Sequence, residues 1–187
     1  TLFLGWAAMN PMAHADGSWR VVNDTVMGGV SRSVVRDHSE GGVSFSGELS
    51  LENNGGFTSV RQTRNDEDWS EATGIELRVR GDGRSYIATV RLENNRRSRV
   101  YYRANFDTRA GAETTHIIPF EDFAPYAYGT PVPAATPLPV VAERIGTIGI
   151  MLADGRPGAF ELHIRSMEPT TEPSEIVRAP RSPATVN

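Results

Sequence analysis

The sequence predicts a single antiparallel β-sandwich of the jelly-roll type, and three observations lead to this fold class. Apolar and polar residues alternate with a period of two over 43–52, 75–80 and 86–92, as they do in strands that bury one face. Gly, Asn and Asp separate these segments, and no amphipathic helix of useful length is apparent. A long Pro-rich connection and the size of the chain suit the crossover of a jelly roll.

The expected strands follow one another between recognisable turns. They cover residues 30–35, 43–51, 57–61, 75–80, 86–92, 100–106, 116–120, 145–152 and 160–164. The chain turns at 38–42, at 81–83, at 94–97 and at 154–158, and Trp69 anchors a short turn in a polar loop. Residues 121–142 contain five prolines, which preclude long regular structure, so this segment is expected to be a long surface loop.

The composition limits the chemistry of the protein. The chain has 187 residues, which is enough for one domain with a substantial core. It has no Cys, which excludes disulfides, thiolate catalysis and Cys-based zinc sites. All 19 basic residues are Arg, so there is no Lys for a Schiff base, while Arg can bind carboxylates and phosphates bidentately. The net charge of -4 argues against general nucleic-acid binding.

We expect three parts along the chain. Residues 1–15 are apolar and end in Ala-His-Ala, which indicates either the remnant of a signal peptide or a segment packed on the domain. A cleaved signal would place the protein in the periplasm, and its absence in the cytoplasm. The β-sandwich is expected over 16–168, with the folded part beginning near Trp19, and 169–187 is expected to be a disordered Pro-rich tail. No stretch approaches the ~20 apolar residues of a membrane-spanning helix.

Two segments that contain a Gly-Gly pair organise the chain, namely 23–31 and 49–61. The second is expected to be a β-hairpin whose turn, 53–56, adopts positive φ easily. On its returning strand, Ser59 and Arg61 share one face with Phe57, while Val60 lies on the other. Such turns indicate that two loops closely approach either a neighbouring backbone or a ligand.

These segments, taken in order, are similar to those of a known family. The residues that carry the resemblance are Trp19, 23–31, 53–61, 80–86, 118–123 and 148–152. Together they resemble the complex I intermediate-associated protein family, over roughly residues 19–166. The resemblance implies a galactose-binding-like jelly roll and a role as an assembly chaperone of NADH:ubiquinone oxidoreductase, and it supplies no catalytic residue.

Five polar residues are the candidates for a binding site: Asn23, Asp24, Asn54, Arg61 and Arg80. If the two Gly-Gly loops meet, their backbone N–H groups and Arg61 can hold an anion or a sugar hydroxyl. Alternatively, Asp24 and Arg61 pair with each other and with turn amides and hold the loops together. Six glycines are expected at structural turns: Gly28, Gly29, Gly55, Gly56, Gly81 and Gly83.

Other clusters give weaker indications of a site. The four His residues lack the spacing of metal ligands, and His163 is expected to be solvated on the outward face of the last strand. A calcium site that involves Asp66 or Asp68 is not demanded by the spacing. The cluster of Arg96, Arg97, Arg99 and Arg103 with Tyr101 and Tyr102 forms either a solvated hairpin tip or a surface for single-stranded nucleic acid.

The sequence therefore favours a non-enzymatic, protein-binding domain that resembles an assembly chaperone of respiratory complex I. No Ser–His–Asp arrangement, cofactor motif or metal motif is recognisable. The alternative is a carbohydrate-binding module of a bacterial envelope or secreted protein, in which Trp69, Tyr101 or Tyr126 stacks on a sugar ring.

Overall fold

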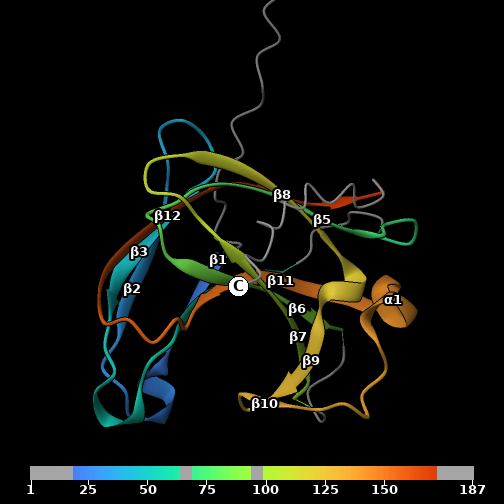
Figure 1. Cartoon of the computed structure of the whole chain (residues 1–187), viewed down its shortest axis with the longest axis horizontal. Helices are drawn as coiled ribbons and strands as arrows, with labels where there is room; N and C mark the ends of the chain where they lie inside the picture. The colour runs from blue at the N-terminus through green and yellow to red at the C-terminus, as the bar shows by residue number, and fades with distance from the viewer. Residues whose placement is uncertain (1–18, 64–68, 94–98, 172–187) are drawn as a thin grey trace, which may run out of the picture.

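Two antiparallel β-sheets face each other in the computed structural model, which describes residues 19–63, 69–93 and 99–171 (Figure 1). This arrangement confirms the predicted all-β jelly-roll sandwich. Several predictions concern residues outside the described ones, namely the segment 1–15, most of the tail, Asp66, Asp68, Arg96 and Arg97. Within the described ranges, no helix is long and apolar enough to cross a membrane.

The larger sheet has seven strands in the order β1-β4-β11-β6-β7-β9-β10. Their bounds are β1 Trp19–Asn23, β4 Thr58–Thr63, β11 Ile145–Leu152, β6 Ser85–Leu92, β7 Tyr101–Asp107, β9 Ala124–Ala127 and β10 Thr130–Pro131. β6 and β7 pair directly, as expected for a hairpin whose tip lies outside the described residues.

The smaller sheet has five strands in the order β2-β3-β12-β5-β8. Their bounds are β2 Arg32–Asp37, β3 Val43–Leu49, β12 Gly158–Thr170, β5 Gly74–Arg80 and β8 Glu113–Pro119. β12 is longer than predicted, because Pro169 and Thr170, which we assigned to the tail, still pair with Ile75 and Gly74 of β5.

The core lies between the sheets and follows from the period-two pattern. In the larger sheet Val60, Ala88 and Ile150 are fully buried, and in the smaller sheet Phe45 and Leu162 fill the same layer. Their outward neighbours form the outer faces of the sandwich. Trp69 is also fully buried, in contact with Phe120, so the expectation that it is exposed for sugar stacking is wrong.

The segment 49–61 is not a hairpin, which corrects our prediction. β3 pairs with β2 and β12 in the smaller sheet, whereas β4 pairs with β1 and β11 in the larger one. The Gly-rich turn therefore carries the chain from one sheet to the other. It includes η2 (Glu52–Asn54), where Asn53 and Asn54 have positive φ. Gly56 also has positive φ (124°), as predicted.

The Pro-rich segment 121–142 has more structure than predicted. It contains the end of η3 (Phe120–Asp122), strands β9 and β10, and the single-turn helix α1 (Leu138–Val141), which η4 (Ala142–Arg144) follows. β9 pairs with β7 and so extends the larger sheet. The prolines are compatible with this because β9 and β10 form its edge.

A buried ion pair fixes the turn that begins β6. Arg84 and Asp154 form two parallel hydrogen bonds, Nη2 to Oδ1 at 2.7 Å and Nε to Oδ2 at 3.0 Å. Arg84 also donates to the backbone carbonyls of Arg156, Gly158 and Ala159. This network ties the β5–β6 and β11–β12 connections together, which is the structural role of the 80–86 motif.

Candidate functional site

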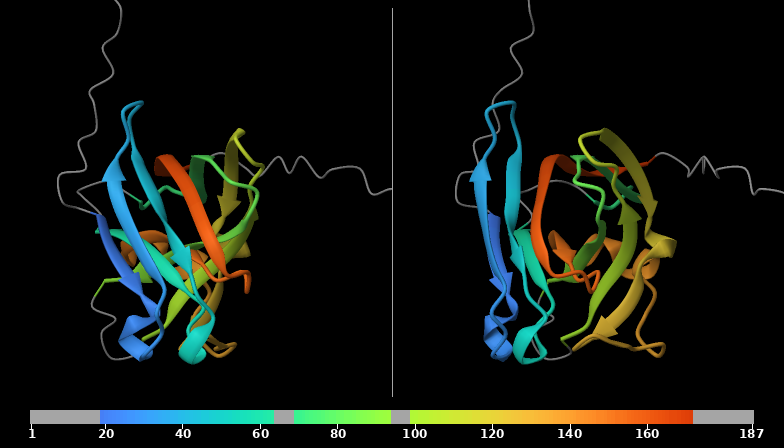
Figure 2. Two further views of the ribbon diagram at one scale, coloured as in Figure 1. Left: turned by 90° about the vertical axis from the view of Figure 1, so that its left-hand side faces the viewer. Right: turned by 60° about the vertical axis from the view of Figure 1, so that its left-hand side comes forward.

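Asp24 joins the two Gly-Gly loops. It begins η1 (Asp24–Met27) and is fully buried beside the turn at Gly55 and Gly56. Figure 2 shows η1 and η2 side by side at one end of the sandwich. We call residues 23–31 and 52–57 the loop junction. The close approach expected of these turns is therefore an approach to Asp24 and to each other.

The carboxylate of Asp24 is surrounded by donors. The Ser31 N–H donates to Oδ1 at 3.0 Å, and the Ser31 hydroxyl donates to Oδ2 at 2.6 Å. The N–H groups of Gly56 and Phe57 also donate to Oδ2, at 2.7 and 3.4 Å. Burial alone would raise the pKa of Asp24, but these hydrogen bonds outweigh it and hold that pKa below the usual value. The N–H groups of these loops therefore bind the carboxylate of Asp24 and not an external anion.

The other predicted binding residues occupy three different places. Asn23 accepts hydrogen bonds from the hydroxyls of Ser33 and Thr58 within the loop junction. Asn54 is exposed in η2. Arg80 lies on β5 of the other sheet and forms an ion pair with Glu40 at 2.6 Å. Arg61 has no ion pair with Asp24 in the described part of the chain, and its side chain lines a cavity instead.

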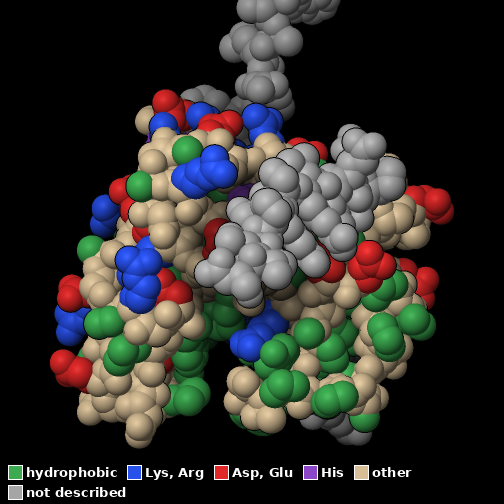
Figure 3. All heavy atoms as spheres, in the orientation of Figure 1, with side chains coloured by type: hydrophobic (Ala, Val, Ile, Leu, Met, Phe, Trp, Pro, Cys, Tyr) green, Lys and Arg blue, Asp and Glu red, His purple; other side chains and the backbone are tan. Residues whose placement is uncertain are grey.

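That cavity is a groove of about 690 Å³ on the outer face of the larger sheet. Its floor comes from β4, β11, β6 and β7, one rim from the loop junction, and the opposite rim from the β9–β10 turn. Figure 3 shows this hollow between the part of the molecule that carries the loop junction and the part that carries β9 and β10, with hydrophobic side chains along the wall next to β10. We call it the Arg–Tyr groove.

Arginines and tyrosines dominate the groove. Among the described residues, its lining includes Arg61, Arg91, Arg99, Arg103, Tyr101 and Tyr128, and no Asp or Glu. Three guanidinium groups lie over tyrosine rings: Arg91 over Tyr101 at 4.9 Å, Arg99 over Tyr128 at 5.4 Å, and Arg103 over Tyr126 at 3.4 Å. Such cation–π contacts orient the arginines without neutralising them.

The groove arginines lack counter-ions in the part of the chain that the structure describes. Among the described residues, none of the ion pairs includes Arg61, Arg91 or Arg103, and Nε of Arg91 is buried without a hydrogen-bond partner. Desolvation, with repulsion from Arg91, lowers the pKa of Arg61 to about 10. Desolvation also lowers the pKa of Arg91. The groove is therefore a partly dehydrated, cationic surface.

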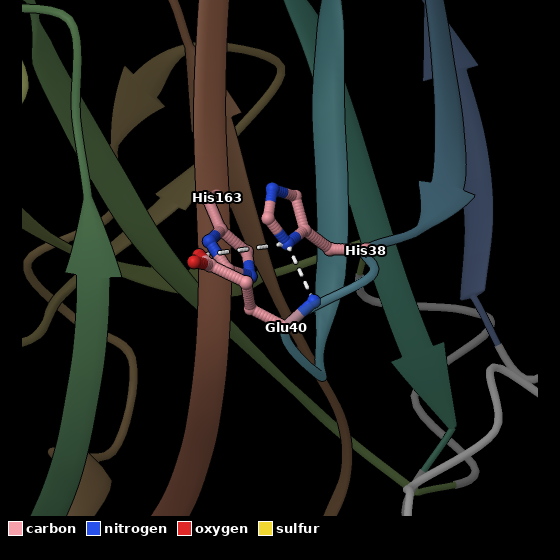
Figure 4. A group of neighbouring side chains, drawn as sticks. All are labelled: His38, Glu40 and His163. Atoms are coloured by element: carbon pink, nitrogen blue, oxygen red, sulfur yellow. Dashed lines mark hydrogen bonds and ion pairs between the residues drawn. The ribbon is translucent and has the colours of Figure 1, made fainter.

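A second polar cluster joins His38, Glu40 and His163 on the smaller sheet (Figure 4). His163 is only 3% exposed and stacks on His38 with ring centroids 3.5 Å apart, so the prediction that it is solvated is wrong. The 38–42 turn covers it, and its Nε2–H donates to the Gly41 carbonyl at 2.7 Å. Nδ1 of His163 faces Arg80, and Glu40 already pairs with Arg80. These partners occupy the atoms that a metal would need, so we treat the cluster as structural.

Sequence reasoning found part of the groove and missed its centre. It identified Arg61, Tyr101, Tyr126 and the Arg99–Arg103 cluster, but it gave no role to Arg91 or Tyr128. Tyr102 from the same cluster is in the core, where its hydroxyl donates to the Thr136 carbonyl at 2.7 Å. The available signal was the strand alternation of Thr89, Arg91, Tyr101 and Arg103, which places all four on one outer face.

Comparisons with known proteins agree with this architecture. The model of the complex I intermediate-associated protein 30 family matches residues 9–164. The mouse (Mus musculus) mitochondrial protein of that name is 33% identical over 111 residues, which are 57% of this chain and 33% of that protein. The chain thus spans about a third of the length of this relative.

Solved structures show the same fold at low identity. The family 11 carbohydrate-binding module of a cellulosomal cellulase from Clostridium thermocellum has a TM-score of 0.59 and 15% identity, covering 84% of this chain and 91% of that one. The Clostridium thermocellum family 11 module in complex with a β-1,3-1,4-mixed-linked tetrasaccharide has a TM-score of 0.58 and 16% identity, covering 82% and 89%. The sandwich is thus shared with these modules, while the sequence match identifies this chain as a member of the complex I intermediate-associated protein 30 family.

Proposed function

We propose that the protein is a non-enzymatic binding domain that holds a segment of a partner protein in the Arg–Tyr groove during assembly of respiratory complex I. The observation that carries this proposal is a groove whose arginines have no counter-ions among the residues that the structure describes. Membership of a family named for complex I intermediates supports a protein partner. The groove residues provide binding contacts rather than a nucleophile beside a general base.

Exposed apolar side chains at both rims favour a polypeptide ligand. Met27 in the loop junction is 68% exposed and Tyr128 in the β9–β10 turn is 77% exposed, and both line the groove. Val26, beside Met27, is 72% exposed. Interfaces between proteins combine such apolar and aromatic contacts with Arg, which matches this distribution.

Site-specific photo-crosslinking tests the proposal. A photoreactive amino acid is placed at Met27, at Tyr128 and, as a control, at Val34, which is exposed on β2 of the smaller sheet. In membranes that contain complex I and its assembly intermediates, the two groove positions should give the same complex I subunits as adducts, and Val34 should give none. Equal labelling at all three positions, or no adduct from the groove, would refute the proposal.

A carbohydrate ligand is the second candidate, favoured by the likeness to a family 11 module solved with a tetrasaccharide. Sugar binding of this kind needs free aromatic faces. Guanidinium groups lie over the rings of Tyr101, Tyr126 and Tyr128 alike, but Tyr128 is the most exposed of the three, at 77%, and is therefore the best platform. A glycan array that includes β-1,3-1,4-linked glucans tests this candidate: binding that Tyr128→Ala abolishes would support it, and no signal would remove it.

A further inference from the structure

We infer that the Arg–Tyr groove selects an acidic polypeptide segment in extended conformation, whose carboxylates bind Arg61, Arg91 and Arg103. This inference rests on the proposed function and specifies the chemistry of the partner. It follows from the register of the arginines across the sheet, from their lack of counter-ions within the described ranges, and from the spacing of side chains along an extended chain.

The strand register aligns the basic residues in a row that crosses the strands. Arg20 pairs with Arg61, Arg61 with Gly149, Gly149 with Thr89, and Thr89 with Arg103. Directly paired residues point to the same face of a sheet. Arg91, two residues after Thr89 on β6, therefore lies on this face in the next row. A basic stripe thus runs across five adjacent strands.

Gly149 allows the stripe to be continuous. A Cβ at this position would lie 3.1 Å from Cγ of Arg61 and 2.4 Å from the Val60 carbonyl oxygen. Without that Cβ, the stem of Arg61 lies close over β11. Since β11 separates β4 from β6, this position brings the charge of Arg61 towards Arg91, in agreement with the repulsion between the two.

An acidic ligand would supply what the groove lacks. The overall chain is acidic, with a net charge of -4, yet the described part of the groove lining contains four arginines and no carboxylate. Arginine binds carboxylates through two parallel hydrogen bonds, and such charge-assisted bonds are the strong ones. A carboxylate between Arg61 and Arg91 would also remove their mutual repulsion.

The spacing fits an extended polypeptide. Neighbouring strands lie about 4.8 Å apart, so the Cα atoms of Arg61 and Arg103, three strands apart, are separated by roughly 14 Å. Every second side chain of an extended segment points the same way, with a repeat of roughly 6.8 Å. Acidic residues at positions i and i+4 span roughly 14 Å and therefore match Arg61 and Arg103, while a carboxylate at i+2 would lie between them and face Arg91 from the neighbouring row.

Fluorescence anisotropy with synthetic peptides tests this inference. The probe is a labelled peptide of about ten residues in which glutamate and serine alternate, and the control peptide has glutamine in place of glutamate. We expect binding of the acidic peptide alone, weakening as salt increases. Arg61→Gln and Arg91→Gln should each weaken it roughly tenfold or more. Arg36→Gln, an exposed arginine on β2 of the smaller sheet, should leave it unchanged.

Three results would overturn the inference. Equal binding of the glutamine peptide would show that charge does not select the ligand, and equal losses in all three variants would show a non-specific effect. Preferential binding of polygalacturonate or of a single-stranded oligonucleotide would assign the stripe to another polyanion. If photo-crosslinking to complex I subunits persists in Arg61→Gln and Arg91→Gln, the proposed function stands and only the acidic specificity fails.

Discussion

The loop junction and the Arg–Tyr groove lie next to each other, and both contain charged groups removed from water. In the loop junction, the carboxylate of Asp24 accepts hydrogen bonds from Ser31, Gly56 and Phe57. In the groove, Arg61 and Arg91 have no such partners in the described part of the chain, and Nε of Arg91 is buried and unsatisfied. The charge of Asp24 is satisfied within the fold, whereas the charges of Arg61 and Arg91 are the ones that we propose bind a ligand.

This difference distinguishes buried charges that stabilise the fold from buried charges that serve another purpose. A buried charge whose hydrogen bonds are complete is costly to remove, because its partners would be left unpaired. A desolvated charge without partners is itself destabilising, so its presence indicates a role outside folding. The variants below test this comparison by their effects on the free energy of unfolding.

The largest effect is expected at the most completely paired arginine. Arg84→Met removes one side of a buried, bidentate ion pair and leaves Asp154 without its partner. We expect a loss of about 3–5 kcal/mol in the free energy of unfolding. Urea denaturation measures it, with the exposed Arg109→Met as the control. A loss below about 1 kcal/mol would show that the pair does not hold the two turns together.

Asp24→Asn should be the next most destabilising change. The amide keeps the shape of the side chain but replaces one acceptor oxygen by a donor that faces other donors. We expect a loss of about 2–4 kcal/mol, because charge-assisted hydrogen bonds are lost in a buried position. Thermal and urea unfolding measure it. If the variant unfolds like the parent protein, the loop junction does not depend on the carboxylate.

The tight packing around Asp24 gives a third prediction. A Cβ at Gly29 would lie 2.4 Å from Cγ of Asp24, so Gly29→Ala should cost about 1–3 kcal/mol. Gly28 has positive φ (94°) and open space around it, so Gly28→Ala should cost only about 1 kcal/mol. In double-mutant cycles, Asp24→Ala should couple with Gly29→Ala and not with Gly28→Ala. Additivity in both cycles would contradict the contact.

The fold was largely predictable because strand alternation and turn chemistry are local properties. The strands in 43–52, 75–80 and 86–92 were recognisable from their period of two. Assignment of strands to sheets was not local: the Gly-rich turn after β3 looked like a hairpin turn, yet it changes sheets. The turn is held by Asp24, a residue more than 30 positions from Gly56, whose carboxylate accepts a hydrogen bond from the Gly56 N–H.

The groove was harder to predict because its residues come from separate strands. Arg61, Arg91 and Arg103 are far apart in the sequence and lie on a common face only through the register of β4, β11, β6 and β7. The outward position of each one follows from alternation. Their convergence, and the absence of carboxylates among the described lining residues, follow only from the order of the strands.

The His38–His163 stack predicts a modest loss of stability in mild acid. Burial lowers the pKa of His163; the Gly41 carbonyl raises it, and the charges of His38, Arg165 and Arg80 lower it further. Glu40 is the carboxylate in this cluster. As the pH falls, His163 therefore binds a proton in the unfolded chain before it does so in the folded one. The contribution of neutral His163 to the free energy of unfolding is complete above pH about 6.5 and is lost as the pH falls towards the pKa of His163 in the folded protein.

Urea unfolding between pH 7.5 and 5 measures this effect. His163→Gln should flatten the profile in this range. Some slope should remain from His116, whose pKa is also lowered by burial and is partly restored by Asp107. A profile that is the same with and without His163 would remove the stack as a pH-sensitive element.

The smallest effect on stability is expected in the groove itself, and this is the most informative result for the comparison. Arg61→Met keeps much of the apolar stem and removes a desolvated charge that Arg91 repels. Because no carboxylate within the described ranges loses a partner, the free energy of unfolding should stay unchanged or rise by up to about 1 kcal/mol. Urea unfolding measures the stability of the variant, which should not fall, and the peptide-binding assay measures its affinity for the acidic peptide, which should fall. A loss of more than about 1 kcal/mol would place Arg61 with Asp24 and Arg84 among the residues that stabilise the fold. The main argument for a ligand in the groove would then fail.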